Sequence, residues 1–172
     1  IFTSDGTLAN AMREIRVHGQ SKRYYHTRIG LGGRMDTLQC AVVLGKLDRF
    51  GWEIAQRDRL GRRYTERLAD TGVATPGVHT DRTSVYAQYT IRMERRDAVR
   101  RGLEQRGIPT AVHYPVPIHR QPAYTAYAEG VVLAQSEAAA AEVLSLPMYP
   151  DMNEATQDRI IEALKQSLSE AA

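Results

Sequence analysis

The chain has 172 residues, of which 42% are hydrophobic and 25% charged, and its formal net charge is +3. This length and composition fit a soluble globular protein of one domain, or a small domain with a piece of another. The longest apolar run, Ala41 to Leu44, is far shorter than the roughly 18 residues of a membrane-spanning helix. We therefore expect no transmembrane segment and, since no signal peptide opens the chain, a cytoplasmic protein.

The single cysteine and the first residues place further limits on the chain. Cys40 excludes an internal disulfide framework, and its helical, apolar surroundings predict a buried, inert thiol. The chain starts with Ile1 in place of methionine, and its first five residues resemble the end of a strand entering a turn. We expect the sequence to be a truncated piece of a longer protein.

A helix is predicted next, with Asp5 as its cap and Gly19 at its end. Its apolar side chains recur at spacings of four and three, at Leu8, Met12 and Ile15. Residues 20–33 then predict a polar, basic loop that ends in a glycine cluster. The backbone N–H groups of Gly32 and Gly33 could hold an anion beside the positive end of a helix beginning near Asp36. An exposed loop that uses glycine only for turning is the commoner outcome of such a pattern, because glycine clusters are weak motifs.

Residues 37–70 carry the longest helical pattern of the sequence, and its second half is rich in arginine on one face. Gly45 and Gly51 could bend or break it, so we expect two helices or one long bent helix. The apolar stripe comprises Leu47, Phe50, Ile54, Tyr64 and Leu68.

The remaining residues predict a small α+β unit, a few strands with helices on one side. Alternation between apolar and polar residues predicts a strand over residues 84–93. The other predicted elements are a helix at 96–106, a strand at 109–114, a helix at 136–144 and a last helix from Asn153.

Two groups in this part could bind a ligand. His113 and Tyr114 end the predicted strand beside prolines, where both rings could contact a polar ligand. From the spacing alone, a structural histidine with Tyr114 packed below it is the commoner outcome. Arg96 and Arg100 share a helical face that could hold phosphate, but a solvated face is the commoner outcome, which we adopt. No zinc spacing, Walker loop or G-x-S-x-G motif is present.

Six blocks of the sequence carry a family resemblance when taken in order: residues 1–5, 16–20 and 30–39 in the first half, and residues 84–89, 110–115 and 144–148 in the second. Together they resemble the DegT–DnrJ type of nucleotide-sugar aminotransferases. Within this family the similarity points to transaminases that aminate the 3-keto group of a UDP-linked 2-acetamido-hexuronic acid in lipopolysaccharide O-antigen synthesis.

The resemblance implies a fold-type-I enzyme that uses pyridoxal 5'-phosphate (PLP) and forms a homodimer with active sites between subunits. It implies residues 1–36 as the tail of the large PLP-binding domain, and 37–172 as a connecting helix with the C-terminal small domain. The family lysine that forms the Schiff base would lie upstream of Ile1, so none of Lys22, Lys46 and Lys165 takes that role. We therefore expect this chain alone to be inactive.

The resemblance also carries over individual site residues. Arg34 matches a family arginine that reaches the substrate from the partner subunit, and His113 and Tyr114 match residues close to the sugar. Gly32 and Gly33 match the loop that contacts the cofactor phosphate. At Gly32 many relatives have an asparagine, so this chain offers only a backbone N–H there.

The intact protein is accordingly expected to move an amino group from glutamate to a keto group of a nucleotide-linked sugar. One alternative is a PLP-dependent sugar dehydratase of the same family, which has histidine in place of the lysine. Another is a non-catalytic oligomerisation or nucleic-acid-binding module, suggested by the sequence pI of about 9.1. We favour no nucleic-acid partner, because the aromatic residues follow the apolar pattern and are not interleaved with the arginines.

Overall fold

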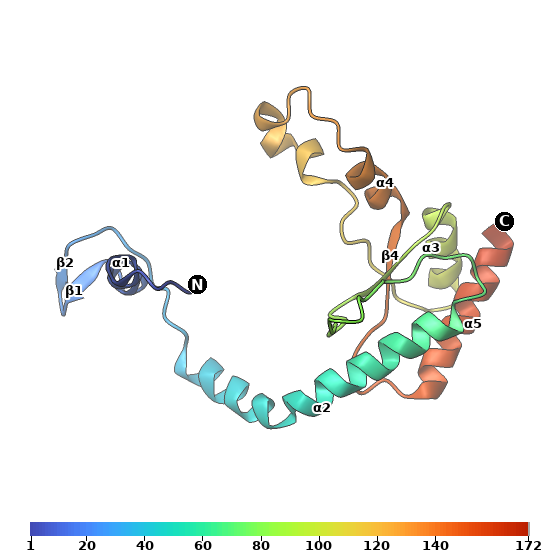
Figure 1. Cartoon of the computed structure of the whole chain (residues 1–172), viewed down its shortest axis with the longest axis horizontal. Helices are drawn as coiled ribbons and strands as arrows, with labels where there is room; N and C mark the ends of the chain where they lie inside the picture. The colour runs from blue at the N-terminus through green and yellow to red at the C-terminus, as the bar shows by residue number, and fades with distance from the viewer. Residues whose placement is uncertain (172) are drawn as a thin grey trace. The chain divides into compact units, whose positions relative to one another are not determined.

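The computed structural model describes residues 1–171 and divides into two compact units, Ile1–Arg49 and Phe50–Ala172. Figure 1 labels the helices and strands and colours the chain from blue at the N-terminus to red at the C-terminus. Helix α2 (Thr37–Arg67) has its first turns in the first unit and the rest in the second. Each unit is described by itself.

The first unit begins with α1 (Gly6–Arg16), whose start and end follow the predicted signals. An Asp5 carboxylate oxygen accepts a hydrogen bond of 2.9 Å from the Leu8 N–H, as expected of an N-cap. Gly19, at a φ of +77°, donates its N–H to the Glu14 carbonyl. A Cβ at Gly19 would lie 1.8 Å from the Arg28 carbonyl oxygen, so only glycine fits this turn.

The predicted loop after α1 is wrong in part, since it contains a small antiparallel hairpin. Strands β1 (Gln20–Lys22) and β2 (Tyr25–His26) pair with each other, and both are largely exposed. Residues 20–26 show no alternation of apolar and polar side chains that would predict these strands, because neither face of the hairpin is buried. An ion pair of 2.7 Å between Arg28 and Glu14 ties the hairpin back to α1.

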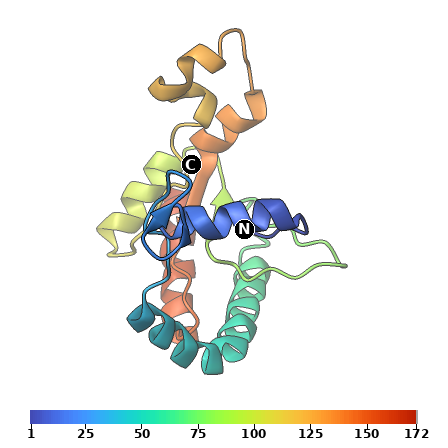
Figure 2. The same cartoon turned by 90° about the vertical axis from the view of Figure 1, so that its left-hand side faces the viewer.

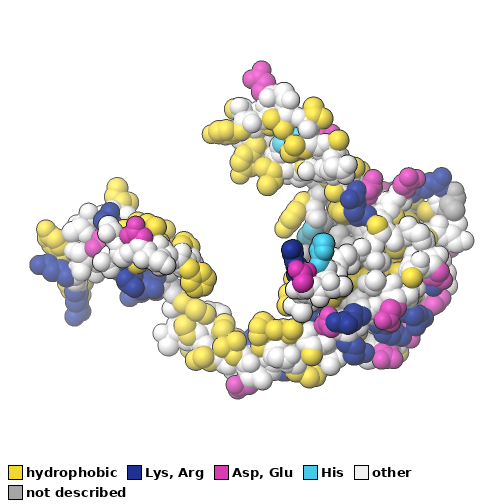
Figure 3. All heavy atoms as spheres, in the orientation of Figure 1, with side chains coloured by type: hydrophobic (Ala, Val, Ile, Leu, Met, Phe, Trp, Pro, Cys, Tyr) yellow, Lys and Arg dark blue, Asp and Glu magenta, His cyan; other side chains and the backbone are white. Residues whose placement is uncertain are grey.

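Helix α2 is continuous, and neither Gly45 nor Gly51 interrupts it. Asp36 caps its start by accepting hydrogen bonds from the N–H groups of Leu38 and Gln39. Its first turns expose their apolar side chains, which Figure 3 shows gathered over this stretch. Cys40 is only half-buried, contrary to the prediction of a buried thiol, because no element of its own unit covers that face. These exposed apolar side chains are Leu38, Val42, Val43, Leu44 and Leu47.

The second unit is built on two antiparallel strands, β3 (Tyr89–Arg92) and β4 (Val143–Leu146). Thr90 is paired with Ser145 in their register. Helix α4 (Ala134–Glu142) ends two residues before the predicted limit, because Val143 turns to an extended backbone and begins β4. Leu144 on this strand is fully buried in the core.

Two strand predictions were too long. In the predicted strand 84–93 only the last residues pair, because Tyr86 has a φ of +41° and turns its ring into the core. That ring lies where a Cβ on Gly61 would stand, 2.5 Å from its nearest carbon. The predicted strand 109–114 is reduced to one bridge, between Ala111 and Ser145.

The core of the second unit lies between this sheet, α3 (Arg96–Gln105), α5 (Glu154–Ala171) and the second half of α2. Figures 1 and 2 both show α5 running beside α2. Two short 3₁₀ helices, η1 (Ile118–Arg120) and η2 (Pro122–Tyr127), precede α4. The fully buried side chains include Leu60, Tyr64, Tyr89, Ile91, Val99, Leu103, Ile161 and Leu164.

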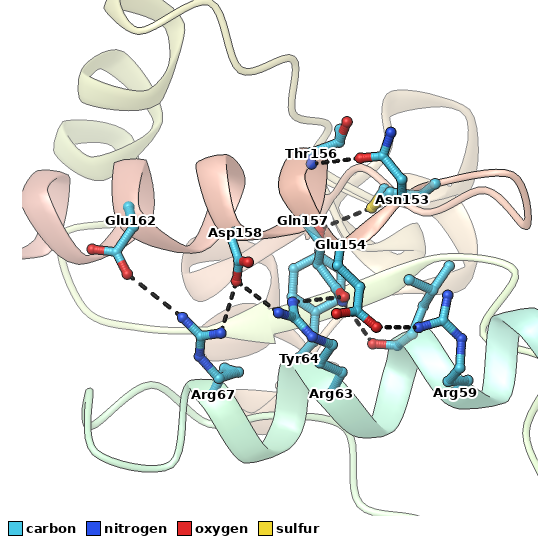
Figure 4. A network of polar contacts seen from close by, with 12 residues as sticks. Arg59, Arg63, Tyr64, Arg67, Asn153, Glu154, Thr156, Gln157, Asp158 and Glu162 are labelled. Atoms are coloured by element: carbon cyan, nitrogen blue, oxygen red, sulfur yellow. Dashed lines mark hydrogen bonds and ion pairs between the residues drawn. The ribbon is translucent and has the colours of Figure 1, made fainter.

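Polar contacts along one side of the α2–α5 interface complete this packing (Figure 4). Arg63 donates to the Gln157 side-chain oxygen at 3.1 Å and to Asp158 at 2.8 Å, and Arg67 donates to the same carboxylate. The Gln157 amide nitrogen donates to the Leu60 carbonyl at 2.8 Å, and Gln157 is completely buried. The arginine-rich face of α2 is therefore an intramolecular contact in its second half.

Arg96 corrects the prediction of a solvated arginine face. Its side chain is 9% exposed, and its guanidinium donates to the carbonyls of Ala140 and Val143 and to Asp97. Arg96 therefore connects α3 to the end of α4 and the start of β4, whereas Arg100 is exposed.

Candidate functional site

The glycine loop of the first unit lies against the end of α1. Leu31 accepts a hydrogen bond of 3.0 Å from the His18 N–H, and the Gly33 N–H donates to the Arg16 carbonyl at 2.8 Å. These bonds flank an antiparallel bridge between Val17 and Gly32. In such a pair the backbone N–H of the bridged residue points away from its partner strand, so the Gly32 N–H faces outward.

Arg34 follows this loop and is exposed. With Gly32, Asp36 and its neighbours Met35 and Thr37 it lines a hollow of about 420 Å³. The helix end here differs from the sequence-based hypothesis, because the Asp36 carboxylate already takes two N–H groups of the first turn of α2. The Gly32 N–H and the Arg34 guanidinium are candidate donors to an anion here, and the guanidinium can bind an oxyanion through two parallel bonds.

His113 and Tyr114 form the second group, at the bridge that leads out of the sheet of the second unit. The His113 Nδ1 atom lies 3.0 Å from the Ser145 hydroxyl, which lies 2.8 Å from the Thr90 hydroxyl. Ser145 is 4% exposed, and its backbone is hydrogen-bonded to Ala111 on its other side. The imidazole is therefore anchored to the sheet through one nitrogen.

Tyr114 stands beside the imidazole and is exposed. The two rings meet edge to face, with centroids 5.6 Å apart, and the peptide bond between them is cis. Both residues line a hollow of about 560 Å³ against α4, together with Pro115, Val116, Gln121 and Ser136 among others. This wall is mostly apolar, with a few polar groups to orient a ligand, which is the usual make-up of a small-molecule site.

A charged contact next to this hollow connects η1 to α4. Glu137 accepts hydrogen bonds from His119, at 2.9 Å, and from Arg120. These donors, His119 first, hold the pKa of the Glu137 carboxyl below its usual range. The contact holds the 117–133 segment to the start of α4, next to His113 and Tyr114 in the same unit.

The predicted site residues thus fall into two groups, one in each unit. Gly32, Gly33 and Arg34 lie together on one loop of the first unit, and His113 and Tyr114 lie together in the second. The sequence did not single out Thr90 and Ser145 as partners of His113. Their opposed positions depend on the register of β3 and β4, for which two hydroxyl residues give no specific signal.

Among residues 1–171 no group of three or more histidine, cysteine, aspartate or glutamate side chains could hold a metal ion. No helix in that same part of the chain is long and apolar enough to cross a membrane.

Comparison with known proteins identifies the family of this chain. The sequence pattern of the DegT/DnrJ/EryC1/StrS aminotransferase family matches residues 1–165. The chain belongs to this family. It is 45% identical over 164 residues to the UDP-2-acetamido-2-deoxy-3-oxo-D-glucuronate aminotransferase of Pseudomonas aeruginosa. The matched region covers 95% of this chain and 45% of the relative. The chain thus spans about half the length of the curated relatives that it matches.

Solved structures confirm the predicted fold class of a fold-type-I aminotransferase. A DegT/DnrJ/EryC1/StrS aminotransferase from Brucella abortus is 41% identical and superposes with a TM-score of 0.88, covering 96% of this chain and 44% of the other. DesV from Streptomyces venezuelae is 36% identical, with a TM-score of 0.89 and a coverage of 96% and 45%. The family resemblance of the ordered sequence blocks is thereby confirmed.

Proposed function

We propose that the whole protein is a PLP-dependent aminotransferase that moves an amino group from glutamate to a keto group of a nucleotide-linked sugar. The observation that carries the proposal is the 45% identity, over nearly the whole chain, to a relative named for a UDP-linked 3-oxo-glucuronate. Supply of an amino sugar to lipopolysaccharide O-antigen is the pathway that we propose on the same basis. The reaction would take place in the cytoplasm.

The cofactor is proposed from the residues of the glycine loop together with the family. A related structure, NtdA from Bacillus subtilis, is 27% identical and contains the bound cofactor PMP. PLP carries a phosphate, and the outward Gly32 N–H could donate a hydrogen bond to it. The Gly33 N–H already donates to the Arg16 carbonyl. When bound, PLP acts as an electron sink for amino-group transfer.

Of the three lysines that the sequence leaves unassigned, two have other contacts. Lys22 lies over the Tyr25 ring, and Lys165 is paired with Asp70. Neither lysine therefore has the surroundings expected of a nucleophilic amine in a cofactor site. We propose that the lysine that binds PLP belongs to a part of the whole protein outside these residues.

The substrate contacts are proposed for Arg34, His113 and Tyr114. Arg34 can hold a carboxylate or phosphate of a nucleotide-linked uronic acid through two parallel hydrogen bonds. His113 and Tyr114 present polar ring atoms on a mostly apolar hollow, which suits the hydroxyl and keto oxygens of a sugar. We propose a homodimer in which Arg34 acts from the partner subunit.

The test is the reaction of the purified whole protein with PLP, glutamate and a UDP-linked 3-keto-uronic acid. We expect 2-oxoglutarate to be released and the amino sugar to appear by mass spectrometry, with a cofactor band between 300 and 500 nm. Arg34→Ala should lower turnover strongly, whereas the exposed control Arg101→Ala should not. Absence of the amino sugar with loss of water from the substrate would instead support a dehydratase.

A further inference from the structure

The side chain of His113 is hydrogen-bonded to a pair of hydroxyl groups, those of Ser145 and Thr90, that have no part in the proposed substrate contact. Thr90 and Ser145 lie directly opposite each other in the β3–β4 register, with their oxygens 2.8 Å apart. Ser145 is almost fully buried, and its oxygen also meets the His113 Nδ1 atom at 3.0 Å. The three side chains therefore form one chain of hydrogen bonds that ends at the imidazole.

The direction of this chain follows from the number of protons. A neutral imidazole carries one proton, on Nδ1 or on Nε2, and each hydroxyl can donate once. If the Thr90 hydroxyl donates to Ser145 and Ser145 donates to Nδ1, both hydroxyl protons have acceptors within the chain. In the opposite direction the Thr90 proton finds no acceptor among the described residues and has to go to solvent from its partly buried position, so only the first direction satisfies both hydroxyl protons within the protein.

We propose that Thr90 and Ser145 are positioning residues that keep the His113 proton on Nε2. His113 then presents a hydrogen-bond donor to the hollow that it lines, and the ligand atom that it meets is an oxygen with free lone pairs. A keto, carboxylate or phosphate oxygen fits that requirement, whereas an N–H or a protonated amine does not. The identity of the substrate contact rests on the proposed function, but the position of the proton does not.

The buried position of Ser145 strengthens this assignment. Its backbone N–H and carbonyl are both bonded to Ala111, so the residue cannot shift without breaking the bridge on that side. Thr90 and Ser145 sit on opposed strands of a sheet, and elements of this kind hold a side chain more precisely than loops do. The imidazole is thus oriented before any ligand arrives, which lowers the entropy lost on binding.

The first experiment measures the proton directly in the whole protein labelled with ring-¹⁵N histidine. The His113 signals are identified by their loss in His113→Gln. We expect an unprotonated Nδ1 and a protonated Nε2. Ser145→Ala should convert His113 to an exchanging mixture of tautomers, and Thr90→Val should shift it less in the same direction.

Conservative variants separate this role from a general loss of structure. Ser145→Thr and Thr90→Ser keep a hydroxyl and should restore the original His113 signals. Ser169→Ala, an exposed serine on α5, should leave them unchanged. A proton on Nδ1 in the unaltered protein, or His113 signals that do not respond to Ser145→Ala, would overturn the proposal.

A second experiment links the tautomer to binding. Loss of one oriented hydrogen bond should raise the KM for the sugar nucleotide by roughly 3- to 10-fold in Ser145→Ala, with a smaller change in kcat. In the His113→Gln background the same substitution should have no further effect. If His113→Gln leaves KM unchanged while the tautomer results hold, the proposed substrate contact fails and the positioning role stands.

Discussion

The two units of this chain are stabilised in different ways. Among residues 1–49, Gly19 is the one buried residue, and α1 buries none of its side chains. Residues 50–171 contain a contiguous core of large apolar side chains and the polar α2–α5 interface. The first unit is held by caps, backbone hydrogen bonds and the close approach of Gly19, whereas the second is held by burial.

This difference shows that well-formed helices need not indicate a self-sufficient domain. Apolar burial is the dominant favourable term in folding, and the first unit gains little of it in this chain. Its exposed apolar residues Leu44 and Leu47 are three positions apart and so share one face of α2. We expect them to be covered in the whole protein, and we expect the isolated chain to self-associate through them.

The largest expected effect compares the same substitution in each unit. Leu103→Ala removes a fully buried side chain of α3 and should lower the free energy of unfolding by about 2–5 kcal/mol. Leu47→Ala removes a half-exposed side chain of α2 and should change it by less than about 0.5 kcal/mol. Urea unfolding followed by circular dichroism measures both, and equal losses would refute the distinction between the units.

The next effect concerns the buried amide of the α2–α5 interface. Gln157→Ala leaves Arg63 without one acceptor in a buried setting and should cost about 1–3 kcal/mol. Gln166→Ala is the control, because Gln166 meets Arg106 at the exposed surface of the same helix. Matching losses in the two variants would show that burial of Gln157 is not what matters.

Two glycines of α2 should respond in opposite directions to one substitution. Gly61→Ala places a methyl group 2.5 Å from the Tyr86 ring and should destabilise by about 1–3 kcal/mol. Gly45→Ala meets nothing within 4 Å and should stabilise by up to about 1 kcal/mol through its better helix propensity. The midpoints of thermal unfolding of the two variants should lie on either side of that of the unaltered chain.

The smallest effect is the acid sensitivity of the second unit. The hydrogen bond from Arg63 and the charge of that guanidinium, followed by the charge of Arg67, hold the Asp158 pKa below its ordinary value. Its contribution is therefore present above an unfolded pKa of about 3.9 and is lost as pH falls through the lower folded pKa. Unfolding titrations below pH 4 should show a shallower loss of stability in Asp158→Asn, and an unchanged slope would argue against this pair.

Part of the candidate site could be predicted from sequence. The order of the blocks identified the family, and the turn at His113 and Tyr114 lies where the prolines place it. The partners of His113 could not be predicted, because Thr90 and Ser145 are 55 residues apart and meet only through strand pairing. The outward N–H of Gly32 likewise depends on its bridge to Val17.

The sequence by itself determined the start and end of α1 and the start of α5. Asp5 and Asn153 cap the starts of α1 and α5, and Gly19 follows the end of α1, because capping involves groups only a few residues apart. Only the tertiary structure decided the strand at 143–146 and the burial of Arg96. A strand requires a partner strand, and Arg96 finds its acceptors 44 and 47 residues further along the chain. No local pattern contains that information.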